Sequence, residues 1–548
     1  MPLQKNQVLT LRVERLSSDG SGVAHSPDGE TVFIPGAAPG DEARVRIVKD
    51  CKRYAFGILD EVLTPSPDRI PVDCAVAGPC GGCSLRHLDY AAELRAKQEN
   101  VADAFARIGG LDVPVLPIVG SPEVNRYRNK VQFPVGVDKS GKPCIGFYAG
   151  RTHRIVPCPD CRLQPGVLNE IGNALCAFFA EKGIQPYSEE TGRGLVRHIF
   201  LRRGAHSGQI MVCLVCTRAK LPSAEELCTR LKAQFAEITT ILLNVNAKNT
   251  NVILGTETHT LYGQGYIEDT LCGVPVQLGP LSFYQVNTLA AEQLYGIAAQ
   301  YAQLTPDDLL LDLYCGMGTI GLSMAAHCRE LIGVEIVPEA IESAKANAAR
   351  MGADVAAKSR FFCADAGQAA TRLAAEGLHP DIVMLDPPRK GCDEATLSAV
   401  VRMSPRRVVY VSCNPATAAR DAAWLEQNGY HAEKVQPVDL FPRTRHCEAV
   451  LLLTKLNVER HIEVDVSMDE LDVTAAESKA TYNEIRDYVW EHYQLKVSNL
   501  YIAQVKQKHG IIERENYHKA KNENAKQPKC PKEKEDAIVE ALKCFKMI

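Results

Sequence analysis

Apolar strands that alternate with helical patterns, from about residue 276 to residue 455, constrain the fold of this chain most strongly. Segments such as LLLDLYC (309–315) and DIVMLD (381–386) are separated by stretches long enough for a helix. Because parallel strands need crossovers of this kind, the pattern predicts a doubly wound α/β domain with a parallel, Rossmann-like sheet. Ligands bind such sheets at the carboxyl ends of the strands, so side chains at those ends are the first candidates for function.

A glycine-rich turn follows the first of these strands. Gly316 and Gly318 lie in GMGTIG, which opens a helix, and Glu335 ends the next apolar strand, 19 residues after Gly316. Glycine lets the backbone approach a ligand closely, and a carboxylate at the tip of the second strand can accept hydrogen bonds from ribose hydroxyls. The pattern predicts a nucleoside cofactor and leaves a dinucleotide and S-adenosylmethionine both open.

Later strands bring further polar residues to the same edge. Asp365 ends the strand in RFFCADA, where it can meet an adenine amino group or cap a helix. Asp386 leads into a double proline that stiffens the backbone, and Cys413 follows the strand RRVVYVS. Glu448 precedes the last apolar strand. Methylation of a pyrimidine at C5 needs a thiolate that adds at C6 and a base that removes the C5 proton, and Cys413 and Glu448 match these two roles.

Residues 1–455 resemble the RNA uracil-C5 methyltransferases, the family of ribosomal and transfer RNA 5-methyluridine enzymes, and are most similar to the ribosomal branch. The motifs that carry the resemblance are SFYQVN (282–287), LDLYCGMGTIGL (311–322), VEIVPEAIESAKANA (334–348), LDPPRKG (385–391), VSCNPAT (411–417) and HCEAVLLL (446–453). The resemblance implies that Cys413 is the nucleophile and Glu448 the general base. It also implies an S-adenosylmethionine pocket lined by Gln285, Tyr314, Gly316, Gly318, Thr319, Glu335, Asp365 and Asp386. Phe283 either stacks on the target base or packs in the core.

The rest of the chain predicts a multidomain protein. Short strands between Asp-Gly and Pro-Gly turns predict a small β-barrel over residues 1–62, which resembles the TRAM domain, an RNA-binding module of the oligonucleotide-binding type. A central α+β domain with a cysteine cluster follows over 65–275, with a helix from about Tyr90 to Gly109. The methyltransferase domain occupies 276–455, and a helical accessory module of unknown role occupies 456–548.

Five of the 20 cysteines form two groups. CAVAGPCGGC contains Cys74, Cys80 and Cys83, and VPCPDC contains Cys158 and Cys161. Four thiolates suit either tetrahedral zinc or an iron–sulfur cluster, and two C-x-x-C pairs are the usual zinc layout. The family resemblance implies instead a [4Fe–4S] cluster, held by Cys74, Cys80, Cys83 and Cys158, and we favour the cluster over zinc. Its expected role is structural or RNA-facing, because methyl transfer needs no electron.

Charge and hydropathy indicate the partners. With 62 Lys and Arg against 66 Asp and Glu, the chain is not a polycation, so an RNA site must be local. Residues 120–205 carry 13 Lys and Arg against 7 Asp and Glu, and NRYRNKVQF (125–133) interleaves aromatic with basic residues, as suits single-stranded RNA. No apolar run approaches the roughly 18 residues of a membrane span, and the N-terminus lacks a signal-peptide layout. We expect a monomeric cytoplasmic enzyme that contacts no membrane.

Together these observations predict S-adenosylmethionine-dependent methylation of uridine C5 in 23S ribosomal RNA through a covalent cysteine–C6 adduct, with the base flipped out of the RNA. The alternatives are a transfer RNA uridine-C5 methyltransferase and a non-catalytic RNA-binding or ribosome-assembly protein. An amino-methyltransferase is disfavoured because Arg389 stands where an aromatic residue is expected and because Cys413 would then have no role.

Overall fold

The computed structural model describes residues 3–150, 152–248, 250–456, 482–509, 530–545 and 547. Contacts between residues divide the chain into two compact units, 1–458 and 459–548. Each unit is described by itself. No helix among the described residues is long and apolar enough to cross a membrane.

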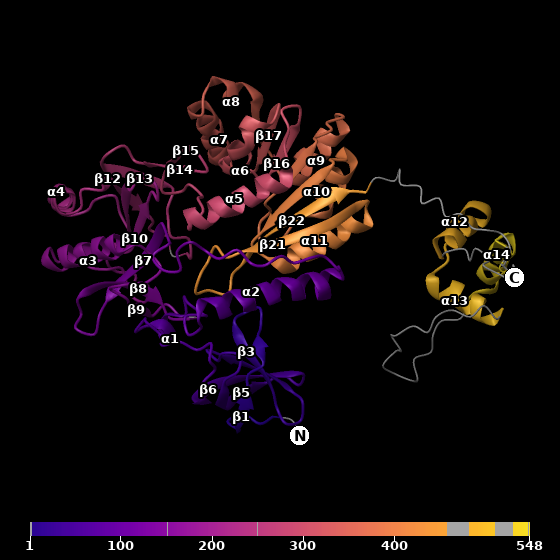
Figure 1. Ribbon diagram of the computed structural model, residues 1–548, viewed down its shortest axis with the longest axis horizontal. Coiled ribbons are helices and arrows are strands. Elements are labelled where there is room, and N and C mark those ends of the chain that lie inside the picture. The colour runs from indigo at the N-terminus through magenta and orange to yellow at the C-terminus, as the bar shows by residue number, and fades with distance from the viewer. Residues whose placement is uncertain are drawn as a thin grey trace. The chain divides into compact units, whose positions relative to one another are not determined.

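The N-terminal part is a six-stranded sheet that wraps its own apolar core (Figure 1). Its strands are β1 (Val8–Arg12), β2 (Arg15–Leu16), β3 (Ser21–His25), β4 (Thr31–Pro35), β5 (Glu42–Asp50) and β6 (Tyr54–Thr64), in the order β1-β5-β6-β4-β3-β2. Along β5 every second residue, Ala43, Val45 and Ile47, is buried, as a sheet with one solvated face requires. The small all-β domain expected from the turn signals is present.

The central part combines one long helix with a seven-stranded mixed sheet in the order β13-β12-β11-β10-β7-β8-β9. Its helices are α1 (Ala77–Cys80), α2 (Tyr90–Ala104), the π-helical turn η1 (Phe105–Gly109), α3 (Gly166–Glu181) and α4 (Ala224–Gln234). Its strands are β7 (Lys130–Val137), β8 (Pro143–Tyr148), β9 (Ile155–Pro157), β10 (Val196–Arg203), β11 (Ile210–Cys216), β12 (Ile238–Val245) and β13 (Glu257–Tyr262), followed by the hairpin β14 (Ile267–Leu271) and β15 (Val274–Leu278). Together α2 and η1 span the residues for which the sequence predicts a helix.

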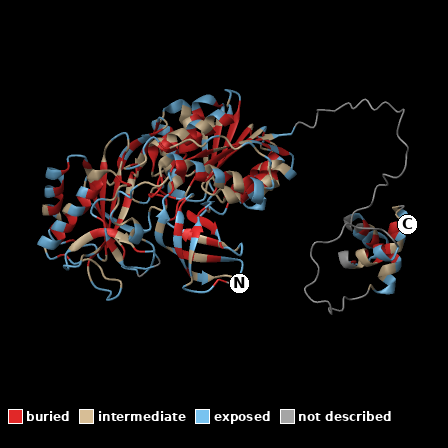
Figure 2. Ribbon diagram, turned by 60° about the horizontal axis from the view of Figure 1, so that its bottom comes forward, coloured by how far each residue is buried: buried red, intermediate tan, exposed pale blue. Residues whose placement is uncertain are grey.

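The third part is the predicted α/β domain, with buried strands between helical layers (Figure 2). Its strands are β16 (Leu309–Leu313), β17 (Glu330–Glu335), β18 (Ser359–Cys363), β19 (Ile382–Leu385), β20 (Arg407–Ser412), β21 (Tyr430–Val438) and β22 (Glu448–Lys455). Its helices are α5 (Thr288–Ala302), α6 (Thr319–Met324), the 3-10 turn η2 (Ala325–His327), α7 (Pro338–Arg350), α8 (Ala353–Lys358), α9 (Ala366–Ala375), α10 (Glu394–Met403) and α11 (Pro415–Gln427).

This sheet is mixed, and the expectation of a wholly parallel sheet is wrong for one strand, β22. The strand order is β18-β17-β16-β19-β20-β22-β21, and the first five strands are parallel. In contrast, β22 is antiparallel to both β20 and β21. A short loop joins β21 to β22 without a crossover helix, so the two strands can pair only in opposite directions.

The second unit contains the helices α12 (Tyr482–Tyr493), α13 (Asn499–Lys508) and α14 (Lys532–Cys544). They pack around a separate apolar core that includes Ile485, Val489, Ile502, Ile538 and Leu542. The helical character expected of this part is therefore present, while residues 457–481 and 510–529 of the predicted module lie outside the described residues.

Buried charges join α2 to the loop between β21 and β22. Lys97 Nζ donates hydrogen bonds to Glu93 Oε1 at 2.8 Å, to Asp439 Oδ1 at 2.7 Å and to the carbonyl of Phe441 at 3.2 Å. The three charged side chains are at most 1% exposed. The main-chain N–H of Arg443 donates to Glu93 Oε1 at 2.7 Å. These bonds fix the loop that leads into Glu448.

Replacing Lys97 with Met should lower the free energy of unfolding by about 3 to 5 kcal/mol, because it leaves two buried carboxylates without their cation. The matched control is Arg95→Met on the same helix. Arg95 pairs with Asp68 at 2.7 Å, but it is 57% exposed, so this change should cost at most about 1 kcal/mol. Urea unfolding measures both variants, and equal effects would contradict the prediction.

Candidate active site

The register of two strands brings Cys413 and Glu448 together. Ser412, the last residue of β20, pairs with Ala449 of β22. Continuing this antiparallel register by one residue places Cys413 opposite Glu448. Glu448 is buried and Cys413 is partly exposed. The proposed nucleophile and base therefore adjoin at one edge of the sheet.

Burial and mutual charge set the acidity of this cluster. Burial, and then the charge of Asp386, raises the pKa of Glu448 to about 8, against an opposing effect of Arg389. Burial raises the pKa of Asp386 to about 7. The pKa of the Cys413 thiol is raised by burial and by the two carboxylates, and is lowered by the charge and hydrogen bond of Arg389. A base with a pKa near neutrality is suited to proton removal.

Hydrogen bonds fix the backbone on both sides of Cys413. Asn414 caps α11 by accepting a bond from the N–H of Ala416 at 3.2 Å. The side-chain amide of Asn414 donates to the carbonyl of Arg389 at 3.0 Å, and the hydroxyl of Thr417 donates to the same carbonyl at 3.3 Å. The segment that carries Arg389 is thereby held beside the thiol. The sequence analysis gave Arg389 no role in the site.

The glycine-rich turn has a backbone conformation that favours glycine. Gly316 and Gly318 have φ values of 55° and 80°, in the left-handed region that glycine tolerates best. The carboxylate of Glu335 accepts bonds from the N–H of Gly316 at 3.2 Å and of Val337 at 2.9 Å. A carboxylate has about four acceptor positions, so Glu335 can still accept bonds from ribose hydroxyls.

Three of the other predicted cofactor residues converge on Tyr295, a buried residue of α5. Its hydroxyl lies 3.2 Å from Thr319 Oγ1 and shares a hydrogen bond with the side chain of Gln285. Burial raises the pKa of Tyr295, and the nearby Asp386 adds to this effect. Sequence reasoning missed Tyr295, since a tyrosine in an apolar helix resembles any core residue.

Asp312 is a second residue that the sequence analysis did not single out. It is buried in β16, and burial raises its pKa to about 8. Its Oδ2 accepts a bond from the N–H of Gly321 at 3.0 Å. A Cβ at Gly321 would lie 2.8 Å from that oxygen, so the helix after the glycine turn can approach β16 this closely only because residue 321 is a glycine.

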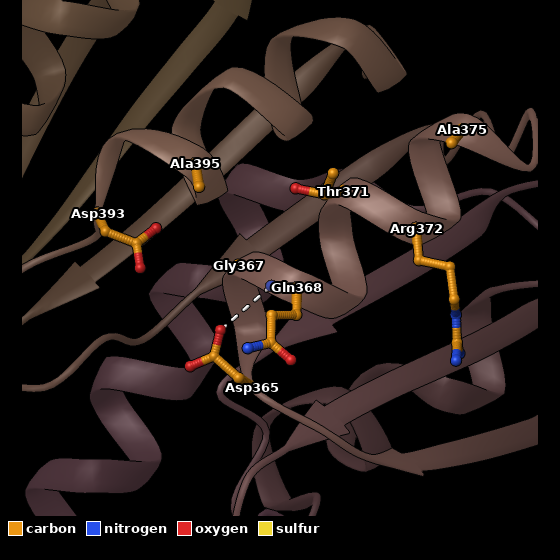
Figure 3. A pocket seen from close by; sticks show the side chains of 8 residues that line it. All are labelled: Asp365, Gly367, Gln368, Thr371, Arg372, Ala375, Asp393 and Ala395. Atoms are coloured by element: carbon orange, nitrogen blue, oxygen red, sulfur yellow. Dashed lines mark hydrogen bonds between the residues drawn. The ribbon is translucent and has the colours of Figure 1, made fainter.

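Tyr314 and Asp365 lie towards the rim of this group. The hydroxyl of Tyr314 is 3.5 Å from Thr396 Oγ1 in α10. Asp365 caps α9 by accepting a bond from the N–H of Gln368 at 3.1 Å, which was the structural alternative to adenine contact. Asp365 also lines an open hollow of about 560 Å³, with Asp393 on its other side (Figure 3). None of the other predicted cofactor residues lines that hollow.

Large apolar side chains are exposed at two places near these residues. Phe283 is 72% exposed, so the alternative that it packs in the core is wrong. Leu281, two residues earlier, is 67% exposed. Directly after Glu335, Ile336 is 62% exposed and Val337 46%. Both pairs offer flat apolar surface to a planar ring.

The cysteines of the two predicted groups lie near one another. Burial raises the pKa of Cys80, and the charges of Cys161 and Cys74 add to this effect. The hydrogen bond that Cys158 shares with Cys161 raises the pKa of Cys158 and lowers that of Cys161 to about 7. Thiols that lie this close together suit a metal ion or an iron–sulfur cluster bound by thiolates. Within the described residues, however, no group of three or more His, Cys, Asp or Glu side chains is arranged so that it could hold a metal ion.

Comparisons with known proteins show the family of this chain. Residues 2–59 match the TRAM domain, and residues 206–456 match the tRNA (uracil-5-)-methyltransferase family. A protein of Halalkalibacterium halodurans named as an RNA methyltransferase is 43% identical over 457 residues, which cover 83% of this chain and 99% of the relative. The chain belongs to the RNA (uracil-5-)-methyltransferase family. An RNA methyltransferase of Clostridium tetani is 40% identical over 83% of this chain and 98% of the relative.

One solved structure has a fold similar to that of this methyltransferase. The tRNA (uracil-54, C5)-methyltransferase of Pyrococcus abyssi, in complex with S-adenosyl-L-homocysteine, has 26% sequence identity and a TM-score of 0.65, covering 81% of this chain and 100% of its own. The chain is thus an RNA uracil-5-methyltransferase that carries a TRAM domain. The second unit, beyond residue 458, lies outside both family matches.

Proposed function

We propose that this enzyme methylates C5 of a uridine in 23S ribosomal RNA through a covalent bond between Cys413 and C6 of the base. The proposal rests on one observation: Cys413, Glu448 and Arg389 lie together at one edge of the sheet. The similarity of the sequence motifs to the ribosomal branch favours ribosomal RNA. The second candidate is transfer RNA, because the solved neighbour from Pyrococcus abyssi is named as a tRNA enzyme.

The arrangement supports a balanced reaction in two stages. The Cys413 thiolate, stabilised by Arg389, adds to C6, and the electrons of the C5–C6 double bond move towards the C4 carbonyl oxygen. C5 takes the methyl group that S-adenosylmethionine supplies; the sulfur–methyl bond breaks and S-adenosylhomocysteine leaves. Glu448 then removes the proton from C5, the double bond re-forms, and the Cys413–C6 bond breaks to release the thiolate. The net change is one proton replaced by one methyl group.

RNA binding in this proposal uses the TRAM domain and the basic region of residues 120–205. A target base must leave its stack to reach a site at the sheet edge. The exposed ring of Phe283, two residues before Gln285, is suited to stack on such a base.

Methyl transfer from labelled S-adenosylmethionine to unmodified 23S and transfer RNA transcripts tests the proposal, with mass mapping of the products. We expect 5-methyluridine in 23S RNA. Transfer to tRNA alone would show that the second candidate is right. Absence of transfer to either RNA would favour the non-catalytic alternative.

The cysteine group is proposed to hold a [4Fe–4S] cluster through Cys74, Cys80, Cys83 and Cys158. Such a group would join the segment before α2 to the segment after β9. Anaerobically purified protein should then be brown and contain about four irons and four sulfides per chain. Cys74→Ser should bleach the protein, since a zinc site made of the two C-x-x-C pairs would leave Cys74 free.

Two further variants decide the fourth ligand. This assignment predicts that Cys158→Ser bleaches the protein and Cys161→Ser does not. The reverse result would transfer the role to Cys161, whose pKa, lowered to about 7, favours the thiolate. A colourless protein that binds one zinc ion, and whose zinc content Cys74→Ser does not change, would contradict the iron–sulfur cluster. The proposed methyl transfer chemistry would not be affected.

A further inference from the structure

Two basic residues face each other across neighbouring strands of the central sheet. Lys130 begins β7, and its antiparallel partner in β10 is Arg202. Directly opposed residues place their side chains on the same face, and like charges so placed destabilise a sheet. Arg202 is 1% exposed, and Lys130 is partly buried. The fold therefore keeps two cations together where water screens them poorly.

Neither cation has an acidic partner among the residues that the structure describes. The guanidinium of Arg202 donates to the carbonyls of Gly279 at 2.8 Å and Ser282 at 2.7 Å, and its buried Nε has no hydrogen-bond partner. Burial, and then the charges of Arg202 and Arg128, lowers the pKa of Lys130 to about 8. Burying charge without a counter-charge costs free energy, so stabilisation of the fold does not explain why these two cations lie together.

The pair lies under the loop that presents Phe283. The two carbonyls bound by Arg202 belong to residues 279–282, immediately before that exposed ring. Next to Lys130, Asn129 donates its side-chain amide to the carbonyl of Gln285 at 2.8 Å. The N–H of Asn129 donates to the carbonyl of Val286 at 2.8 Å. Both strands thus hold this loop at the point where the two positive charges meet.

We propose that Lys130, backed by the buried charge of Arg202, binds an RNA phosphate next to the uridine that enters the site. This inference rests on the proposed function and adds a contact to it. An ammonium is a compact charge that suits a phosphate, and the ligand brings the negative charge that the strand pair lacks. Arg202 acts through its field and by holding the loop, because its guanidinium is buried.

One other ligand offers a negative charge to Lys130, the carboxylate of S-adenosylmethionine. It is considered because Gln285, a candidate cofactor residue, lies in the loop that Asn129 binds. We favour RNA because Lys130 lies within the basic region of residues 120–205 and next to Asn129, which binds the loop that presents Phe283. The two sources predict different losses when the charge is removed, so the experiment measures both affinities.

The test compares Lys130→Met with Lys130→Arg and with a matched control, Lys220→Met. Lys220 is an exposed lysine in the segment after β11, outside the basic region of residues 120–205. Affinity for unmodified 23S RNA is measured at several salt concentrations without cofactor, so that no turnover is needed. The affinity for S-adenosylmethionine and the midpoint of thermal unfolding are measured beside it.

Lys130→Met should weaken RNA binding about tenfold and lower the slope of log affinity against log salt by about 0.7, the loss of one phosphate contact. Lys130→Arg should restore most of the affinity, and Lys220→Met should match the wild type. The unfolding midpoint of Lys130→Met should not fall and is expected to rise, which a merely structural lysine would not allow.

Three results would overturn this inference. One is equal RNA affinity of Lys130→Met and Lys220→Met. Another is a loss of S-adenosylmethionine affinity with RNA binding unchanged, which would assign the site to the cofactor carboxylate. The third is a lower unfolding midpoint that Lys130→Arg restores with no change in RNA affinity. Because binding is measured without turnover, RNA that binds through Lys130 but is not methylated would contradict the proposed function alone.

Discussion

Cys413→Ala should abolish methyl transfer to RNA, with a loss of at least about 10⁴-fold, and should leave the affinity for S-adenosylmethionine within about threefold. The thiol is the group that makes C5 nucleophilic, so nothing else in the site replaces it. The glycine turn and Glu335 belong to β16 and β17, and their mutual hydrogen bonds do not involve Cys413. Binding and chemistry should therefore separate, as calorimetry and single-turnover transfer would show.

Cys363→Ala is the matched control for this prediction. Cys363 also ends a parallel strand of the same sheet, β18, and is exposed. Its register partner is Glu335 of β17 rather than Glu448, and its thiol donates to the carbonyl of Ile336 at 3.6 Å. Its removal should leave turnover unchanged. Substantial transfer by Cys413→Ala would show that Cys413 is not the nucleophile.

The strand-end argument predicted Cys413 and Glu448 for partly different physical reasons. Cys413 follows the parallel strand β20, so the general rule about carboxyl ends applies to it directly. Glu448 is the first residue of β22, and it reaches the same edge only because β22 runs antiparallel to β20. Hydrophobic patterning identifies a strand but not its direction, so these two residues were paired by the chemistry of C5 methylation, and the family resemblance then implied the same pair.

Contacts between distant segments lay beyond the sequence analysis. Lys97 and Asp439 are 342 residues apart and meet at 2.7 Å inside the protein. A lysine in a helix and an aspartate after a strand each resemble solvated surface residues. The sequence also does not show where a side chain points. Tyr314 follows β16 as predicted, but its hydroxyl is directed towards α10. Local patterns predict which elements form, whereas packing decides what their side chains touch.

Glu448→Gln should stall the reaction after the methyl group has been transferred. Glutamine keeps the shape of the side chain but cannot accept the C5 proton, so the Cys413–C6 bond has no route to break. We expect a covalent complex of protein and methylated RNA that survives denaturing gel electrophoresis, with multiple turnover reduced by at least about 10³-fold.

The variant should remain folded, which makes the stall interpretable. Burial raises the pKa of Glu448 to about 8, well above the ordinary value for a glutamate, so the folded protein binds this proton more tightly than the unfolded chain. Stability from this group is therefore complete at low pH and is lost as the pH rises towards 8. Glutamine, being neutral throughout, should remove that loss and raise the midpoint of unfolding at pH 8.

Two controls complete this experiment. Glu433→Gln changes an exposed carboxylate on β21 that accepts a bond from Thr454 Oγ1 at 2.6 Å, and it should turn over normally without a trapped complex. The double variant Cys413→Ala with Glu448→Gln should form no covalent complex, because the atom that bonds to C6 is gone. Rapid and complete product release by Glu448→Gln would assign proton removal to another group. A complex that persists in the double variant would move the covalent bond away from Cys413, since no other step of the proposed chemistry attaches the base to the protein.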